Sequence, residues 1–307
     1  MLELSHVTKS YGAHRVLNDL SFAVRPGRLT GFVGGNGAGK TTTMRIILGV
    51  LAKDAGSVTI NGAALTSADR RRFGYMPEER GLYPKMKVGE HITYLARLHG
   101  FDKGEAETRA TALLEQLGLG ERLNDTVEKL SLGNQQRAQI AAALVHEPDV
   151  LILDEPTVGL DPKQIIEIRE VIKGLGGDHT VILSTHILPE VSMTCGQLVI
   201  INNGRIAGEG TPESLMAQLK EGEVLRAHID GPTDEIRAML QGLEGVLDVS
   251  SEPGEGIYLV TSAPGQDVRD ALTKQVVDGG YSLRELRPLD MTLEDIFLSL
   301  TSEEVAA

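Results

Sequence analysis

The chain has 307 residues, of which 41% are hydrophobic and 24% charged, and it carries a formal net charge of −13. This composition is typical of a folded globular protein of about two domains, and it excludes a disordered or fibrous chain. The acidic balance argues against a nucleic-acid partner, because negative charge repels phosphate backbones.

The first 60 residues are predicted to be mainly strands. The expected strands cover residues 2–7, 20–24, 29–33 and 57–60. The third of them runs directly into a glycine-rich loop, which a helix over 41–48 follows. Asn61-Gly62 marks a turn after the fourth strand.

The middle of the chain is predicted to be helical. Apolar residues recur at three- and four-residue spacing from residue 88 onward and again around 113–117, and a third helix is expected over 134–145. The segments expected after it are buried strands at 150–153 and 181–184, a helix that Pro162 opens, and a hairpin over 197–208. Short apolar strands that alternate with helices are typical of an α/β core with a parallel sheet, to which the early strands add an antiparallel part.

The charged segment 220–223 is the predicted domain boundary. Beyond it, strands are expected at 224–229, 246–249, 256–261 and 282–287, and helices at 233–243, 266–277 and 292–300. This β-α-β-β-α-β order suits a small α+β ferredoxin-like domain over 224–307. An apolar stripe in the last helix is interpreted as core packing rather than as a partner-binding face; its members are Leu293, Ile296, Phe297 and Leu300.

Neither an export signal nor a membrane span is expected. The first residues contain no basic stretch followed by an apolar run, so no signal peptide is predicted. The apolar runs near 140–145 and 198–201 are far shorter than the roughly 20 residues that a membrane helix needs. Cys195 is the single cysteine, so no intrachain disulfide is possible, and a buried structural thiol is expected.

Residues 34–41 carry the P-loop pattern, Gly-x4-Gly-Lys-Thr, between a predicted strand and a predicted helix. Such glycines let backbone N–H groups wrap the β- and γ-phosphates, and the helix adds its positive N-terminus. Lys40 places a positive charge on the phosphates, and the Thr41 hydroxyl can bind magnesium. The residues expected to hold the nucleotide are Gly34, Gly35, Asn36, Gly37, Ala38, Gly39, Lys40, Thr41 and Thr42.

An apolar strand that ends in two carboxylates forms the second motif, over residues 150–155. Asp154 can hold magnesium, directly or through water, and Glu155 can orient and polarise an attacking water. By itself this is only a strand that runs into an acidic loop. It indicates catalysis because it follows a P-loop, and the two motifs together predict an ATPase that uses ATP and Mg²⁺.

The order of the motifs resembles that of the ABC-type ATPases. Leu130-Ser-Leu-Gly-Asn-Gln-Gln-Arg137 is similar to the signature motif of that family, and Gly159-Leu-Asp161 and Ser184-Thr-His186 follow it in the family's order. The resemblance spans about residues 1–218. It implies a P-loop ABC-type ATPase domain with a mixed sheet and a helical subdomain at about 88–145.

The resemblance implies that two copies of the chain act together. Ser131 and the amides that open the next helix form an anion site at a helix N-terminus. In the family this site, here with Gly133 and Asn134, caps the γ-phosphate of ATP bound to the partner subunit. Since the chain has one P-loop and one signature, a two-fold, head-to-tail homodimer with two sandwiched ATP molecules is implied.

Further roles are implied residue by residue. Tyr11 stands where the family places an aromatic ring that stacks on adenine, and the alternative is a half-buried tyrosine at a strand end. Asp161 resembles the loop aspartate that couples the two sites across the dimer. His186 resembles the histidine that contacts the γ-phosphate, which makes it a catalytic candidate beside Glu155 and Lys40.

Two positions depart from the family's pattern. The signature has Leu132-Gly133-Asn134 in place of Gly-Gly-Gln, and the retained Gly133 preserves close backbone approach to phosphate. Glu78 follows Gly-Tyr-Met-Pro77 where the family often has Gln, which touches magnesium and water. A carboxylate at Glu78 can still bind magnesium, but it changes the local charge.

Residues 77–86 resemble an exporter-type branch described as sodium or drug efflux ATPases, and the C-terminal segment resembles its accessory domain. The implied function is ATP-driven transport, with export as the expected direction, through a separate membrane permease. The chain would then be cytoplasmic and peripheral on the inner face of the cell membrane.

Two other functions are alternatives to ATP-driven transport. A soluble ABC-type ATPase that acts on a ribosome or on DNA is the alternative, but such proteins usually have two ATPase units or long coiled-coil insertions. A regulator that binds nucleotide without hydrolysis is disfavoured, because the residues needed for turnover are all present; they are Lys40, Asp154, Glu155 and His186.

Overall fold

The computed structural model describes residues 1–79, 81–218, 224–251 and 256–288. The chain divides into two compact units, and the division falls after Pro212. The predicted boundary segment 220–223 and the predicted last helix 292–300, with its apolar stripe, lie outside the described residues.

A six-stranded sheet forms the centre of the first unit, in the order β10-β9-β3-β8-β7-β6. Its strands are β3 (Leu29–Val33), β6 (Phe73–Met76), β7 (Val150–Asp154), β8 (Thr180–Thr185), β9 (Gln197–Asn202) and β10 (Arg205–Gly210). All neighbouring pairs are parallel except β9 and β10, which form the predicted hairpin. Every residue of β3, β7 and β8 is buried, as expected for strands that are covered on both faces.

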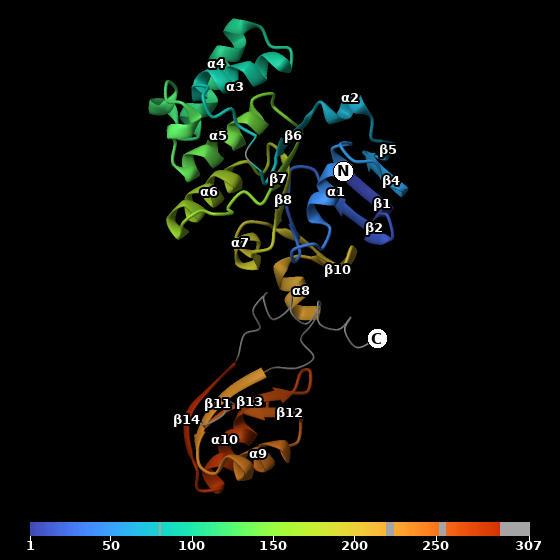
Figure 1. Ribbon diagram of the computed structural model, residues 1–307. Helices are drawn as coiled ribbons and strands as arrows, with labels where there is room; N and C mark the ends of the chain where they lie inside the picture. The colour runs from blue at the N-terminus through green and yellow to red at the C-terminus, as the bar shows by residue number, and fades with distance from the viewer. Residues whose placement is uncertain (80, 219–223, 252–255, 289–307) are drawn as a thin grey trace. The chain divides into compact units, whose positions relative to one another are not determined.

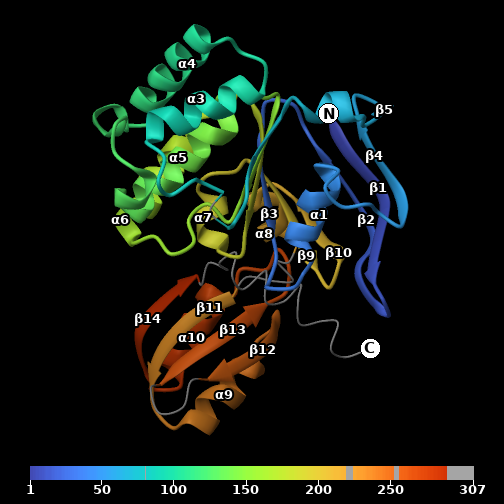
Figure 2. The ribbon, with the colours of Figure 1, turned by 45° about the horizontal axis from the view of Figure 1, so that its top comes forward.

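The predicted antiparallel part is a second sheet, in the order β2-β1-β4-β5. Its strands are β1 (Leu2–Tyr11), β2 (His14–Val24), β4 (Ala55–Ile60) and β5 (Ala63–Ala64). Helix α1 (Lys40–Ile47) lies between the two sheets, as Figures 1 and 2 show. Met44 and Ile47 of this helix belong to one buried cluster with Phe22 of β2 and Phe32 of β3, whose rings lie 5.0 Å apart.

The predicted helices of the middle segment are present and lie together beside the six-stranded sheet (Figure 2). They are α3 (Val88–Leu98), α4 (Lys103–Gln116) and α5 (Leu132–Leu144), with short 3-10 turns at Gly120–Arg122 and Val127–Lys129. Helix α5 begins two residues before the prediction, because Ser131 caps it by accepting a hydrogen bond from the Asn134 N–H. The remaining helices of the unit are α2 (Ser67–Arg70), α6 (Pro162–Gly174) and α7 (Leu188–Ser192).

Helix α8 (Pro212–Gln218) starts at the division, and all its residues after Pro212 belong to the second unit. The elements after it are β11 (Val224–Asp230), α9 (Thr233–Gln241), β12 (Val246–Ser251), β13 (Ile257–Ser262), α10 (Arg269–Asp278) and β14 (Ser282–Pro288). The strands form an antiparallel sheet in the order β12-β13-β11-β14. Tyr258 of β13 is buried among Ile236 and Leu240 of α9 and Leu272 and Val276 of α10, so both helices pack on this sheet.

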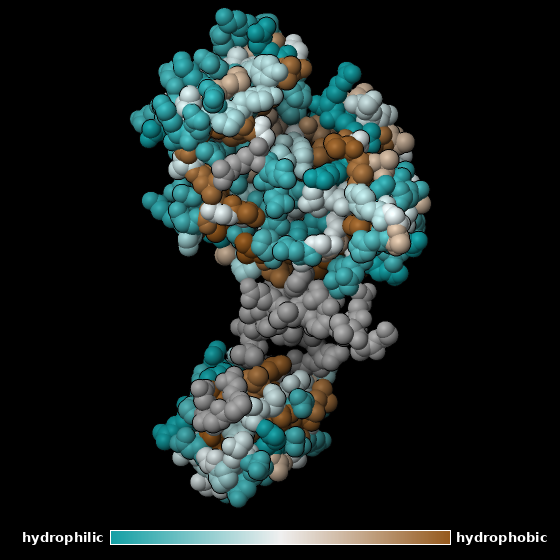
Figure 3. Space-filling model, viewed as in Figure 1, coloured by the Kyte–Doolittle hydropathy of each residue, from teal (hydrophilic) through white to brown (hydrophobic). Residues whose placement is uncertain are grey.

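The surface of the first unit is mainly polar. The face in Figure 3 is mostly hydrophilic, with separate hydrophobic patches on the first unit. None of the helices in the described part of the chain combines the length and the apolar character that crossing a bilayer requires. Cys195 is buried as predicted, and its burial raises the pKa of the thiol to about 12.

Candidate active site

The glycine-rich loop connects the end of β3 to the start of α1 and packs tightly against its neighbours. A Cβ on Gly34 would lie 2.5 Å from the carbonyl oxygen of Ile201. Gly39 has a φ of 109°, and a Cβ there would lie 2.6 Å from Leu17 Cδ2. Only glycine fits these two positions without a clash. The two glycines of the P-loop pattern are therefore required by packing, in addition to any role in phosphate binding.

Gly34→Ala is expected to lower the free energy of unfolding by about 2 kcal/mol, since the added methyl group overpacks the loop against Ile201. Urea denaturation followed by circular dichroism measures this change. The neighbouring Gly35→Ala is the matched control, because no heavy atom lies within 4 Å of a Cβ at Gly35. An equal loss of stability in the two variants would contradict the packing argument.

A cavity of about 470 Å³ lies over the loop and the first turn of α1. The predicted site residues that line it are Gly35, Asn36, Gly37, Gly39, Lys40, Thr41, Thr42, Glu78, Glu155 and His186. His14, Val16 and Val158 also line it, and no sequence pattern had indicated them. The structure therefore brings the P-loop, the second carboxylate of the β7 motif and the histidine after β8 to one place.

Lys40, Glu155 and His186 form a connected polar cluster at this cavity. Lys40 Nζ lies 3.4 Å from Glu155 Oε1, and both side chains are buried. His186 Nδ1 lies 2.9 Å from Glu155 Oε2; since a carboxylate only accepts, this nitrogen carries the proton. Lys40 Nζ also donates to the carbonyl oxygens of Gly34 and Gly35, at 2.7 and 3.2 Å.

The backbone holds Glu155 in a strained conformation. Its φ is 50°, in the left-handed region that residues with side chains rarely adopt. The Glu155 N–H donates a hydrogen bond to the carbonyl oxygen of Ser184 on β8, at 2.9 Å. This bond holds the backbone of Glu155 against the end of β8. Strain of this kind is concentrated at functional sites, where the surrounding structure holds it.

Asp154 offers a buried carboxylate oxygen to a cation. The side chain is fully buried, and Oδ1 accepts a hydrogen bond from the Ser184 hydroxyl. Oδ2 has no partner among the described residues. Burial, and secondly the charge of Asp154, raise the pKa of nearby Tyr75 to about 12, so this phenol stays neutral. An unpaired buried carboxylate oxygen fits a divalent cation such as magnesium.

Thr157 and Glu190 brace the loop that follows Glu155. The Thr157 hydroxyl donates to Glu190 Oε2 at 2.6 Å, and both side chains are buried. Burial raises the pKa of Glu190, the hydrogen bond from Thr157 lowers it, and the charge of Glu155 raises it again. Sequence reasoning missed this pair, because 33 residues separate its members and no motif contains both.

Several predicted residues do not line the cavity. Tyr11 is half exposed at the end of β1, with Lys9 Nζ 5.8 Å from its ring centroid. Asp161 caps α6 by accepting from the Gln164 N–H at 2.9 Å. The other predicted residues outside the described lining are Gly34, Ala38, Ser131, Gly133, Asn134 and Asp154.

Comparisons with known proteins identify the family. The profile of the family described as "ABC transporter" matches residues 17–158. The chain is 32% identical to the linearmycin resistance ATP-binding protein LnrL of Bacillus subtilis (strain 168), over 98% of each chain. It is 36% identical to the Nod factor export ATP-binding protein I of Paraburkholderia xenovorans (strain LB400), over 99% of this chain and 98% of the relative.

A solved structure described as an ATP-binding subunit of an ABC transporter is 35% identical in sequence. It covers 71% of this chain and 92% of its own, with a TM-score of 0.62. The similarity of sequence and fold, together with the cavity over the P-loop, confirms the predicted ATPase class. The chain belongs to the family of ATP-binding, ATP-hydrolysing subunits of ABC transporters.

Proposed function

We propose that this chain powers the export of a substrate through a separate membrane permease, by binding and hydrolysing ATP at the cavity over the P-loop. The observation that carries the proposal is the position of Glu155, which lines this cavity between Lys40 and His186. Export is supported by the two relatives described above, which are named for resistance and for Nod factor export. The permease would hold the chain at the inner face of the cell membrane.

The loop amides, the N-terminus of α1 and Lys40 would bind the phosphates. Glu155 would orient an attacking water and accept its proton, and the hydrogen bond from His186 would keep the carboxylate in position. His186 also lines the cavity, so its ring is placed to contact the γ-phosphate.

Asp154, Thr41 and Glu78 are the proposed magnesium residues. The described residues contain no cluster of three histidine, cysteine or carboxylate groups that could hold a metal by themselves. The remaining ligands would therefore be phosphate oxygens and water, as is usual for magnesium in nucleotide sites. A bound magnesium ion would neutralise charge on the β- and γ-phosphates.

We also propose that a second copy completes the site. Ser131, Gly133 and Asn134 lie at the start of α5, a 13-residue helix whose N-terminus can bind an anion, yet they do not line the cavity of their own chain. A head-to-tail dimer would place them on the γ-phosphate of the partner's ATP. Asp161, at the start of α6, would couple the two sites.

Tyr11 is proposed to stack on the adenine. It pairs with His14 across the β1–β2 hairpin, and His14 lines the cavity. The ring is half exposed, so an aromatic base could cover it. This position at the cavity edge supports the proposed role over that of a tyrosine that merely ends a strand.

The proposed domain division is an ABC-type ATPase domain at 1–218 and an accessory domain at 224–307. The strand order β12-β13-β11-β14, with α9 and α10 packed on the same sheet, supports a ferredoxin-like class for the accessory domain.

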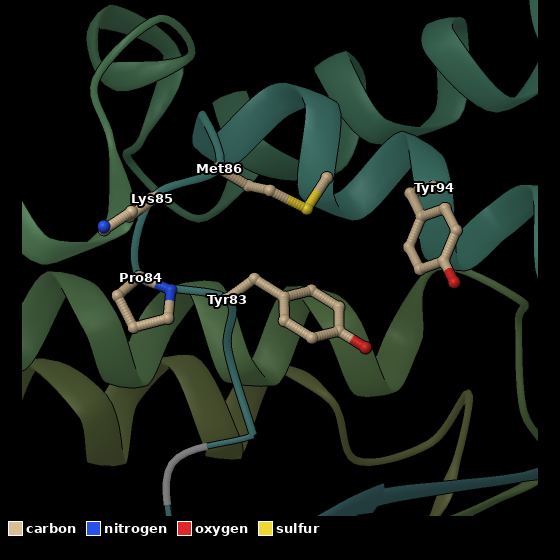
Figure 4. A pocket seen from close by; sticks show the side chains of 5 residues that line it. All are labelled: Tyr83, Pro84, Lys85, Met86 and Tyr94. Carbon is tan, nitrogen blue, oxygen red and sulfur yellow. The ribbon is translucent and has the colours of Figure 1, made fainter.

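An aromatic groove is the proposed docking site of the permease. Tyr83 and Tyr94, shown in Figure 4, line a cavity of about 570 Å³ together with Pro84, Lys85 and Met86. Tyr83 is 53% exposed and Tyr94 41%, with ring centroids 6.3 Å apart. Exposed aromatic groups of this kind favour a partner with an apolar segment. The groove begins five residues after Glu78, so part of its lining is close in sequence to a residue that lines the nucleotide cavity.

Replacing Tyr83 and Tyr94 together by Asp is expected to reduce recovery of the chain with its permease in solubilised membranes by at least about tenfold. The ATPase activity of the isolated chain should stay unchanged, because neither ring lines the nucleotide cavity. Val50→Asp is the matched control, since Val50 is an exposed apolar residue outside the groove. Undiminished co-purification of the double variant would contradict docking at this groove.

A further inference from the structure

A buried hydrogen bond joins the two loops that carry Glu155 and His186. Thr157 lies two residues after Glu155, and Glu190 lies four residues after His186, on α7. The Thr157 hydroxyl donates to Glu190 Oε2 at 2.6 Å, and the two residues are only 5% and 9% exposed. Neither of them lines the nucleotide cavity, so neither side chain would contact the bound nucleotide.

Helix α7 gives Glu190 a fixed support. Val191 of this helix is fully buried and packs on β3, where a Cβ on Gly31 would lie 3.0 Å from the Val191 side chain. The Glu190 N–H donates to the carbonyl oxygen of Ile187 at 3.3 Å, and the Glu190 carbonyl oxygen accepts from the Thr194 hydroxyl at 2.6 Å. Since its backbone is bonded on both sides, the Glu190 carboxylate is a firm anchor for the loop after β7.

The loop after β7 depends on such an anchor. Glu155 has a φ of 50°, and strain of this kind persists only where the surrounding structure holds it. The Val158 N–H donates to the Glu155 carbonyl oxygen and the Leu160 N–H to that of Thr157, at 3.3 and 3.2 Å, so these two bonds stay within the loop. Among the described residues, the Thr157 hydroxyl is the group that joins segment 156–160 to another element by a hydrogen bond.

We infer that Thr157 and Glu190 are positioning residues for ATP hydrolysis, because their hydrogen bond holds the loop that carries Glu155. The inference rests on the proposed function, in which Glu155 orients the attacking water. His186 Nδ1 lies 2.9 Å from Glu155 Oε2, so a shift of the loop would disturb the carboxylate and its partner together. Misplacing a catalytic group slows the reaction, whereas the P-loop amides and Lys40 would still bind the phosphates. The pair therefore acts on kcat rather than on KM.

Thr157→Val in the full chain tests this inference, because valine has nearly the shape of threonine but no hydroxyl. We expect kcat for ATP hydrolysis to fall at least about tenfold while KM changes by less than about twofold. Thr157→Ser restores the donor, so its kcat should return to within about threefold of that of the unmodified chain. Ser192→Ala is the matched control and should leave kcat unchanged, since the Ser192 hydroxyl of α7 donates to the carbonyl oxygen of Pro189 and joins no second loop.

Two substitutions of Glu190 separate the hydrogen bond from the charge. Glu190→Gln removes the charge but keeps an oxygen that accepts from Thr157, so kcat should stay within about threefold of normal. Glu190→Ala removes the acceptor and should lower kcat at least about tenfold, as Thr157→Val does. An equal loss in the glutamine and alanine variants would contradict positioning through this hydrogen bond.

Combining Thr157→Val with Glu155→Gln distinguishes positioning from general damage. If Thr157 acts through Glu155, the added substitution should lower the residual turnover of Glu155→Gln by less than about twofold. A further tenfold loss would overturn the inference, as would a Thr157→Val variant with a lower Tm and a normal kcat, in which the bond is only structural. Normal turnover in Glu155→Gln itself would instead contradict the proposed function.

Discussion

Glu155→Gln is expected to lower ATP turnover about a thousandfold while ATP binding is retained. Glutamine has the same size, so the cavity over the P-loop keeps its shape. Its amide cannot accept the proton of an attacking water, and it removes the negative charge beside Lys40 and His186. Since ATP would bind without being cleaved, the ATP-bound dimer should accumulate.

The measurement combines phosphate release, nucleotide affinity and size-exclusion chromatography in the presence of ATP and magnesium. Glu170→Gln is the matched control, because Glu170 is an exposed glutamate on α6 that pairs with Lys173 and does not line the nucleotide cavity. It should hydrolyse ATP at the normal rate. Turnover within a fewfold of the unmodified chain in Glu155→Gln would remove Glu155 from the mechanism.

Two inactive variants are expected to restore activity when they are mixed, if two copies share each site. Lys40→Ala damages the half of the site that contains the P-loop. Ser131→Arg damages the other half, because it places a large side chain at the exposed start of α5. Each variant alone should lose at least about a hundredfold in turnover. A mixed dimer would have one site in which both halves are intact. Equal mixing produces mixed dimers in half of the pairs, so about one quarter of the normal turnover should return.

The geometry also supplies a matched control for this mixing experiment. Lys40 and Glu155 lie 3.4 Å apart in one chain, so they belong to the same half of the site. Mixing Lys40→Ala with Glu155→Gln should restore nothing, because every site would then contain a damaged loop half. Recovery in this control, or its absence in the first mixture, would contradict the head-to-tail arrangement.

Elements with strong local patterns were predicted well, and those that depend on their neighbours were not. The strand and helix around the P-loop, the three helices of the middle segment and the buried strands β7 and β8 all followed from apolar spacing. Strand β6 was missed, because four residues, Phe73–Met76, are too few to show a period. Its pairing with β7 is what makes it a strand.

The residues of the candidate site were likewise predicted where they stand in a local motif and missed where they do not. The sequence alone indicated Lys40, Asp154, Glu155 and His186, since each stands in a short motif with its own chemistry. It could not indicate that His14, Val16 and Val158 complete the cavity lining. Nor could it show the hydrogen bonds from Thr157 to Glu190 and from Ser184 to Asp154.

The sequence by itself was enough to predict phosphate binding at Gly34 to Thr41, because a P-loop is one continuous segment whose backbone would do the binding. Only the tertiary structure decided which distant side chains share that cavity. β3, β7 and β8 are parallel neighbours, so residues after their ends meet at one edge of the sheet although more than 100 positions separate Lys40 from Glu155.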